Sequence, residues 1–229
     1  SPGWNVSSGT GSAIRLSWTG PCAGRHGRPR AAAPPESAGR LRGTGPPGPS
    51  ATAPGTVAGV ILVDAADLAA SRPGKPLFTG LSVTVASGDR LGVVGVNGSG
   101  KSTLLGVLGG TVEPEGGTIR RGCGARVVAL DQAAALPAGT VRQAVGETWE
   151  ADALLDRVGM AALAGVDVGS LSGGQAKRTA LARALAAVGE SGEGDLLILD
   201  EPTNHLDMDA IAWLEDRLAG FRGGLVLVT

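Results

Sequence analysis

Eight residues near the middle of the chain have the types and spacing of a phosphate-binding loop. The pattern G-x-x-x-x-G-K-[ST] is met by Gly95, Val96, Asn97, Gly98, Ser99, Gly100, Lys101 and Ser102. Glycines permit the backbone conformations that aim successive N–H groups inward, and a helix that follows adds its positive N-terminal dipole. We expect Lys101 to reach the β- and γ-phosphates of ATP, the Ser102 hydroxyl to ligate Mg²⁺, and Thr103 to lie among the nucleotide contacts. The alternative is a glycine-rich turn with a surface lysine.

An acidic pair nearer the C-terminus could supply the hydrolytic chemistry. Asp200 ends the apolar run 196–199, and open α/β sheets bind ligands at the carboxyl ends of their strands. We expect Asp200 to hold Mg²⁺ through water, and Glu201 to deprotonate the water that attacks the γ-phosphate. Gln132, after the strand-like run 126–130, is a further candidate for the metal and the water. The alternative is a solvated pair or a helix cap.

The elements that must position these residues alternate between strands and helices. Residues 61–63 and 81–85 have the pattern of an antiparallel sheet with one face covered. Residues 91–95 form an apolar strand before the glycine-rich loop, and a helix then runs to about Leu108, which is a unit typical of parallel sheets. Residues 196–200 and 225–229 predict two central strands. Between them, Ile211, Leu214 and Leu218 have helical spacing, with Asp207 as the N-cap.

A third motif carries a family resemblance. The pentapeptide Leu171, Ser172, Gly173, Gly174 and Gln175 opens an alanine-rich helix and resembles the signature of ATP-binding cassette (ABC) ATPase domains. In that family the signature is a second anion site, which faces the γ-phosphate bound by an opposite cassette. The resemblance implies an α/β P-loop NTPase fold with a mixed central sheet, an antiparallel β subdomain and a small helical subdomain. It also implies ATP and Mg²⁺ as ligands and a second cassette as partner.

The run from Asp200 to Asp207 narrows the resemblance to the ABC-F group. Its letters, DEPTNHLD, are the form typical of that group, whose members carry two cassettes and many of which act on the ribosome. The resemblance implies a cytoplasmic ATPase with a ribosome or RNA partner, in translation or in antibiotic resistance, and makes His205 and Asp207 part of the D-loop. Two alternatives stay open: the ATP-binding subunit of an ABC transporter, and a nucleotide-binding fragment without catalysis.

Three features depart from the family pattern. The stretch 71–75 lacks the aromatic residue that usually stacks on adenine, and we expect the planar guanidinium of Arg72 to stack there instead. The chain ends at Thr229, where the family next places a switch histidine. It also contains one cassette and no interdomain linker, so we expect it to be the first half of a longer product, incomplete at its C-terminus.

Composition divides the chain into two regions. Residues 1–55 hold six arginines, no lysine, one acidic residue and nine of the fourteen prolines. Such a segment buries too little apolar surface to offset its ordering entropy, so we expect disorder there, and a natural start near Val60. A basic arm that touches RNA is the alternative. Residues 60–229 are expected to form the ATP-binding domain.

The remaining composition is that of an ordinary soluble domain. The chain has 229 residues, 42% hydrophobic and 18% charged, with a net charge of −1, so it has no overall basic character to bind nucleic acid. Cys22 and Cys123 are too far apart to indicate a disulfide framework or a zinc site. No run of about 18 apolar residues is present, and the N-terminal residues lack a basic head followed by an apolar core, so we expect neither membrane insertion nor export.

Overall fold

The central element of the fold is a six-stranded mixed sheet. The computed structural model describes residues 3–8, 13–19, 59–73, 75–130, 135–189 and 192–228. The sheet has the order β1-β2-β5-β9-β8-β7. The five strands β2, β5, β9, β8 and β7 are parallel to one another, and β1 pairs antiparallel with β2 at one edge. The bounds are β1 (Gly3–Ser8), β2 (Ala13–Thr19), β5 (Arg90–Val94), β7 (Arg126–Leu130), β8 (Asp195–Asp200) and β9 (Gly224–Val228).

A second, antiparallel sheet has the order β4-β3-β6. Its strands are β3 (Ile61–Arg72), β4 (Lys75–Ala86) and β6 (Gly116–Arg121). β3 and β4 are longer than the runs 61–63 and 81–85 predicted, because irregular pairing interrupts their alternation. At one such interruption Asp67 has a φ of 53° and its N–H donates to Ser82 Oγ at 2.9 Å. The expected combination of a mixed sheet and an antiparallel sheet in an α/β fold is confirmed.

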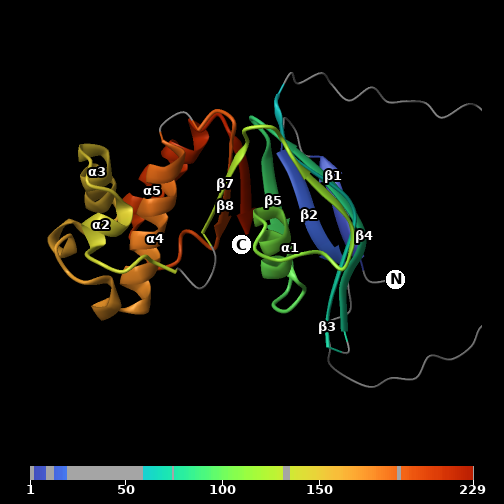
Figure 1. Ribbon diagram of the computed structural model, residues 1–229, viewed down its shortest axis with the longest axis horizontal. Helices are drawn as coiled ribbons and strands as arrows, with labels where there is room; N and C mark the ends of the chain where they lie inside the picture. Colours follow the sequence, from blue (N-terminus) through green and yellow to red (C-terminus); the bar gives the residue numbers. More distant parts are fainter. Residues whose placement is uncertain are drawn as a thin grey trace, which may run out of the picture. The chain divides into compact units, whose positions relative to one another are not determined.

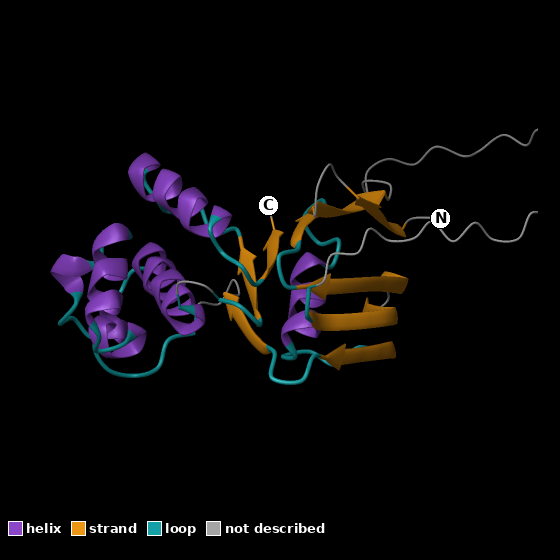
Figure 2. Ribbon diagram, turned by 90° about the horizontal axis from the view of Figure 1, so that it is seen from above, coloured by secondary structure: helices purple, strands orange, loops and turns teal. Residues whose placement is uncertain are grey.

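The mixed sheet separates two hydrophobic cores. Side chains of β8 alternate between them: Leu196 and Ile198 belong to the core with the antiparallel sheet and α1 (Lys101–Gly109), whereas Leu197 and Leu199 belong to the other. That second core includes α4 (Gly173–Val188) and α5 (Met208–Ala219). Figure 1 and Figure 2 show α1 on one side of the central strands and α4 and α5 on the other. The burial of both faces explains why residues 196–199 of β8 are all apolar.

Short helices between β7 and α4 form a helical region. They are α2 (Val141–Val145), α3 (Trp149–Arg157) and two 3₁₀ turns at Ala161–Leu163 and Val168–Ser170. Thr140 and Thr148 cap α2 and α3, since each hydroxyl accepts a backbone N–H of the first turn. α2 and α3 both pack on α4. Of the helices in the described part of the chain, none is both long and apolar enough to cross a bilayer.

Two strands occur where disorder was expected. β1 and β2 lie within residues 1–55, and β2 pairs in parallel with β5. The expectation of disorder is therefore wrong for residues 3–8 and 13–19. Composition averaged over 55 residues concealed a local pattern, because Ile14, Leu16 and Trp18 alternate with polar residues at the period of a strand. The other positions of residues 1–55, for which disorder was also expected, lie outside the described residues.

Candidate functional site

The loop 95–100 connects β5 to α1, as the sequence predicts. Two of its glycines have left-handed backbones, with φ values of 78° at Gly98 and 97° at Gly100. The Leu104 N–H donates to Gly100 O at 2.9 Å, so the first turn of α1 forms directly after the loop. Side chains other than glycine adopt such φ values at a cost, which explains the glycines at these two positions.

Lys101 and Ser102 face two different parts of the site. The Lys101 Nζ donates to the carbonyl of Gly95 at 2.6 Å, so the ammonium group lies over its own loop. The Ser102 hydroxyl donates to Asp200 Oδ2 at 3.5 Å, a long contact that joins the start of α1 to the end of β8. The structure thus brings together the loop and the acidic pair, which are about 100 positions apart in the sequence.

A hollow of about 350 Å³ opens at this junction. It is lined by loop residues, both members of the acidic pair and one residue of β3: Arg72, Asn97, Gly98, Gly100, Lys101, Ser102, Asp200 and Glu201. Arg72 therefore lines the same hollow as the phosphate loop, and its stacking on a base stays a prediction. The volume of the hollow is in the range of small-ligand sites, and the ammonium group of Lys101 suits a polyanionic ligand.

Asp200 is half-buried, and its burial raises the pKa of its carboxyl group above the ordinary value. The negative charge of the neighbouring Glu201 raises the pKa further, while Lys101, the Ser102 hydroxyl and Lys177 act in the opposite direction. The surroundings of Asp200 thus disfavour a second negative charge beside Glu201. A cation at this position would offset that effect.

The described residues fit Mg²⁺. That ion prefers oxygen ligands, keeps several waters and takes one or two protein groups together with substrate phosphates. The Ser102 hydroxyl and the Asp200 carboxylate supply two such oxygens, which lie 3.5 Å apart in the lining of the hollow. Gln132, the third candidate ligand, lies outside the described residues.

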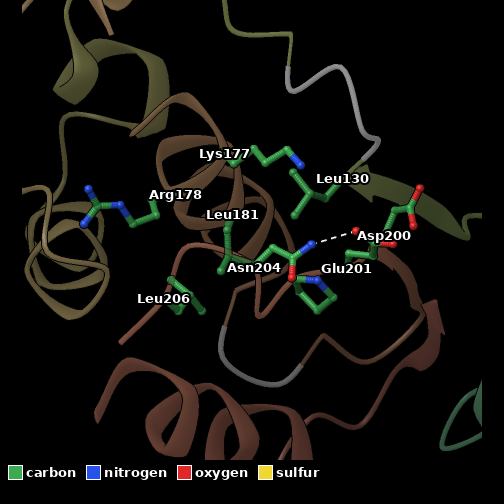
Figure 3. Close-up of a pocket in the computed structure, with 9 residues that line it drawn as sticks. Leu130, Lys177, Arg178, Leu181, Asp200, Glu201, Asn204 and Leu206 are labelled. Atoms are coloured by element: carbon green, nitrogen blue, oxygen red, sulfur yellow. Dashed lines mark hydrogen bonds between the residues drawn. The ribbon is translucent and has the colours of Figure 1, made fainter. Parts of the chain in front are cut away.

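Glu201 occupies a tight turn directly after β8. Its φ is 47°, a conformation that few residues other than glycine adopt, and its N–H donates to Val228 O at 3.1 Å at the end of β9. The Asn204 side-chain amide donates to Glu201 Oε2 at 2.6 Å, the contact drawn in Figure 3. Sequence reasoning missed this contact; the spacing of three residues across a turn was its only signal.

The signature pentapeptide is at a different place. Ser172 is the N-cap of α4: its hydroxyl accepts the Gln175 N–H, and the Gln175 side chain accepts the Ser172 N–H at 2.9 Å. None of the residues 171–175 lines the hollow. One copy of the chain therefore does not bring the signature to its own phosphate loop. His205 packs against Gly174, since a Cβ there would lie 3.3 Å from the imidazole.

The other predicted site residues have simple placements. Asp207 is the N-cap of α5, as the sequence predicts, and its carboxylate accepts the Ala210 N–H at 2.8 Å. Val96 is 48% exposed in the loop, and Thr103 is half-buried in α1. The contacts of Asp207, Val96 and Thr103 with a nucleotide remain predictions.

Comparison with known proteins adds an independent finding. A family model described as "ABC transporter" matches residues 78–204, more than half of the chain. The zinc import ATP-binding protein ZnuC of Paracoccus denitrificans is 37% identical over 183 residues, which cover 73% of this chain and 69% of that protein. The energy-dependent translational throttle protein EttA of Mycobacterium tuberculosis is 30% identical over 202 residues, with 68% of this chain and 35% of that protein covered.

A solved structure has a similar fold. Cbio1 of Clostridium perfringens, described as part of the ABC transporter complex cbiONQ, superimposes with a TM-score of 0.51 at 23% identity, over 74% of this chain and 78% of that one. By contrast, this chain spans only 27% and 31% of the length of two further curated relatives. The matched part is therefore one portion of those longer proteins.

Proposed function

Because the chain belongs to the ABC transporter family of ATP-binding domains, we propose that the hollow binds Mg-ATP and that two such cassettes together hydrolyse it. The observation that carries this proposal is the junction of the phosphate loop with the acidic pair, joined through Ser102 and Asp200. Backbone N–H groups of the loop and Lys101 bind the β- and γ-phosphates. Arg72 stacks on the base.

The residues assigned to the metal and to the attacking water have distinct roles in this proposal. Ser102 ligates Mg²⁺ directly and Asp200 holds it through water, with Gln132 as a further ligand. The ion neutralises charge on the phosphates. Glu201 accepts the proton of the water that attacks the γ-phosphate, as general base.

Hydrolysis requires a second cassette in this proposal. Ser172 and the first N–H groups of α4 form an anion site at a helix N-terminus, and they lie apart from the chain's own hollow. Residues 171–175 therefore contact the γ-phosphate held by the partner cassette, and Asp207 lies at the same interface. Pairing gives two shared sites.

Two cellular roles are compatible with this chemistry. The DEPTNHLD run and the likeness to EttA, named for translational control, favour a cytoplasmic ATPase of the ABC-F type that acts on the ribosome or its RNA, in translation or antibiotic protection. The likeness to ZnuC, of which the chain covers 69%, favours the ATP-binding subunit of a transporter. Sedimentation of the tagged chain from cell extract distinguishes them, with the ribosome pellet expected for the first role and the membrane fraction for the second.

The variant Glu201→Gln tests the catalytic assignment. It keeps the size and the hydrogen-bonding shape of the side chain but removes the base, so we expect ATP to bind as before. We expect single-turnover hydrolysis by paired cassettes to slow by about 10²- to 10⁴-fold, the usual contribution of a general base. Hydrolysis at the rate of the unmodified protein would contradict the assignment of Glu201.

A further inference from the structure

Asn204 is the only described residue whose side chain donates a hydrogen bond to Glu201. Its amide Nδ2 lies 2.6 Å from Glu201 Oε2, and its backbone N–H donates to the Glu201 carbonyl at 3.2 Å. The short distance is that of a charge-assisted hydrogen bond. Backbone and side chain of Asn204 thus both bind the residue that we assign as the base.

The backbone of Glu201 is held firmly, but its side chain depends on Asn204. The Glu201 N–H donates to Val228 O at 3.1 Å, and its φ of 47° departs from the extended backbone of β8. The carboxylate itself can rotate about three bonds, which would spread its oxygens over several positions. The bond from Asn204 occupies Oε2 and leaves Oε1 as the oxygen that can accept a proton from water.

Lys177 does not replace Asn204 in this task. Lys177, Glu201 and Asn204 line one small cavity between α4 and the turn after β8, and Figure 3 shows the Lys177 side chain reaching from α4 toward the acidic pair. Among the described residues, however, neither of the two ion pairs within 4 Å involves Lys177. Lys177 therefore acts on the pair at a distance, whereas Asn204 sets the orientation of one oxygen.

We propose that Asn204 is a positioning residue, which holds Glu201 Oε2 so that Oε1 faces the attacking water. The inference rests on the proposed ATPase function and assigns a role to a residue four positions after Asp200. Its consequence is specific. Loss of the amide donor slows the hydrolytic step while ATP binding is retained, because Asn204 does not line the nucleotide hollow.

Two variants separate positioning from a role in the turn alone. Asn204→Asp keeps the size and the turn preference of the residue, but it removes the donor and places a carboxylate beside Glu201. Asn204→Ala removes the donor without adding charge. We expect the single-turnover rate of paired chains to fall about 10- to 100-fold in both variants, with at least as large a loss in Asn204→Asp and an unchanged Kd for ATP.

Thr203→Asp is the matched control. Thr203 is the exposed neighbour in the same turn, so this variant adds the same charge without touching the Asn204 amide, and we expect a rate close to that of the unmodified chain. A rate in Asn204→Asp that equals the unmodified rate would overturn the proposal. So would equal losses in Asn204→Asp and Thr203→Asp.

A double-variant cycle links the effect to Glu201. In the Glu201→Gln background, Asn204→Asp is expected to cause no further loss, since the group that it positions is already gone. A further loss of tenfold would overturn the proposal. If Glu201→Gln itself hydrolyses ATP at the full rate, the proposed function fails instead, and the two failures are thereby distinguished.

The contact is also measurable in a chain that does not turn over. The Asn204 side-chain amide proton that is donated to Glu201 is expected to lie downfield of its position in a free amide, and to move upfield in Glu201→Ala. Amide shifts that are unaffected by Glu201→Ala would overturn the proposal without reference to catalysis.

Discussion

Replacing Gly100 by alanine tests how the phosphate loop is held against the antiparallel sheet. Gly100 has φ 97° and ψ 12°, and an added Cβ would lie 3.0 Å from Leu77 Cβ and 3.5 Å from its Cγ and Cδ1. A left-handed conformation costs an alanine about 1–2 kcal/mol. Leu77 is 2% exposed on β4 and cannot move freely, so overpacking adds about 1–3 kcal/mol. We expect a loss of about 2–5 kcal/mol, a large part of the roughly 5–15 kcal/mol that stabilises a typical domain.

Urea unfolding of the matched alanine variants measures these contributions separately. Gly98 has a φ of 78° but nothing within 4 Å of an added Cβ, so Gly98→Ala should lose only the conformational part, about 1–2 kcal/mol. Gly173 begins α4 with open space and without a left-handed φ, and Gly173→Ala should stay within about 0.5 kcal/mol of the unmodified chain. Equal stabilities of Gly100→Ala and Gly98→Ala would refute the contact with Leu77. Equal stabilities of Gly100→Ala and Gly173→Ala would refute the loop geometry as well.

Three further predictions concern the hollow. Lys101→Ala should weaken ATP binding about 10- to 150-fold, because hydrogen bonds to charged groups contribute about 1.5–3 kcal/mol, and calorimetry with adenosine should show no such loss. Arg72→Ala should weaken the binding of ATP about two- to fivefold, because an exposed cation–π contact contributes about 0.5–1 kcal/mol. Inorganic triphosphate should bind as before. An equal loss of affinity for both ligands would contradict stacking. Asp200→Asn should raise the Tm of the nucleotide-free chain at neutral pH. Burial raises the pKa of Asp200 in the folded chain, so the folded state binds the proton more tightly and loses stability as pH rises through the range between the unfolded and folded pKa values. A Tm difference that persists unchanged in acid, where both side chains are neutral, would contradict that cause.

Local patterns predicted the parts of the site that depend on neighbours in sequence. The unit of β5, loop and α1 follows from an apolar run, glycines and Lys101, and the N-cap at Asp207 follows from its place before a helical stripe. Each of these features needs only short-range physics: backbone freedom at glycine, capping and hydrophobic periodicity.

Other features depend on tertiary structure and could not be predicted in the same way. The bond from Asn204 to Glu201 requires the positive φ of Glu201 and one side-chain rotamer, and neither leaves a pattern in the sequence. The irregular pairing near Asp67 breaks the alternation that marks a strand, so β3 and β4 were predicted too short. Pairing of β2 with β5 joins segments about 75 positions apart, a contact that composition conceals.

Calorimetric titration of the folded chain with ATP tests the central claim most directly, with and without Mg²⁺. The arrangement of loop and carboxylates predicts saturable heat with one nucleotide per chain, and weaker binding when a chelator removes the metal. A chain that shows a cooperative melt, and is therefore folded, but gives no heat with Mg-ATP would contradict the account.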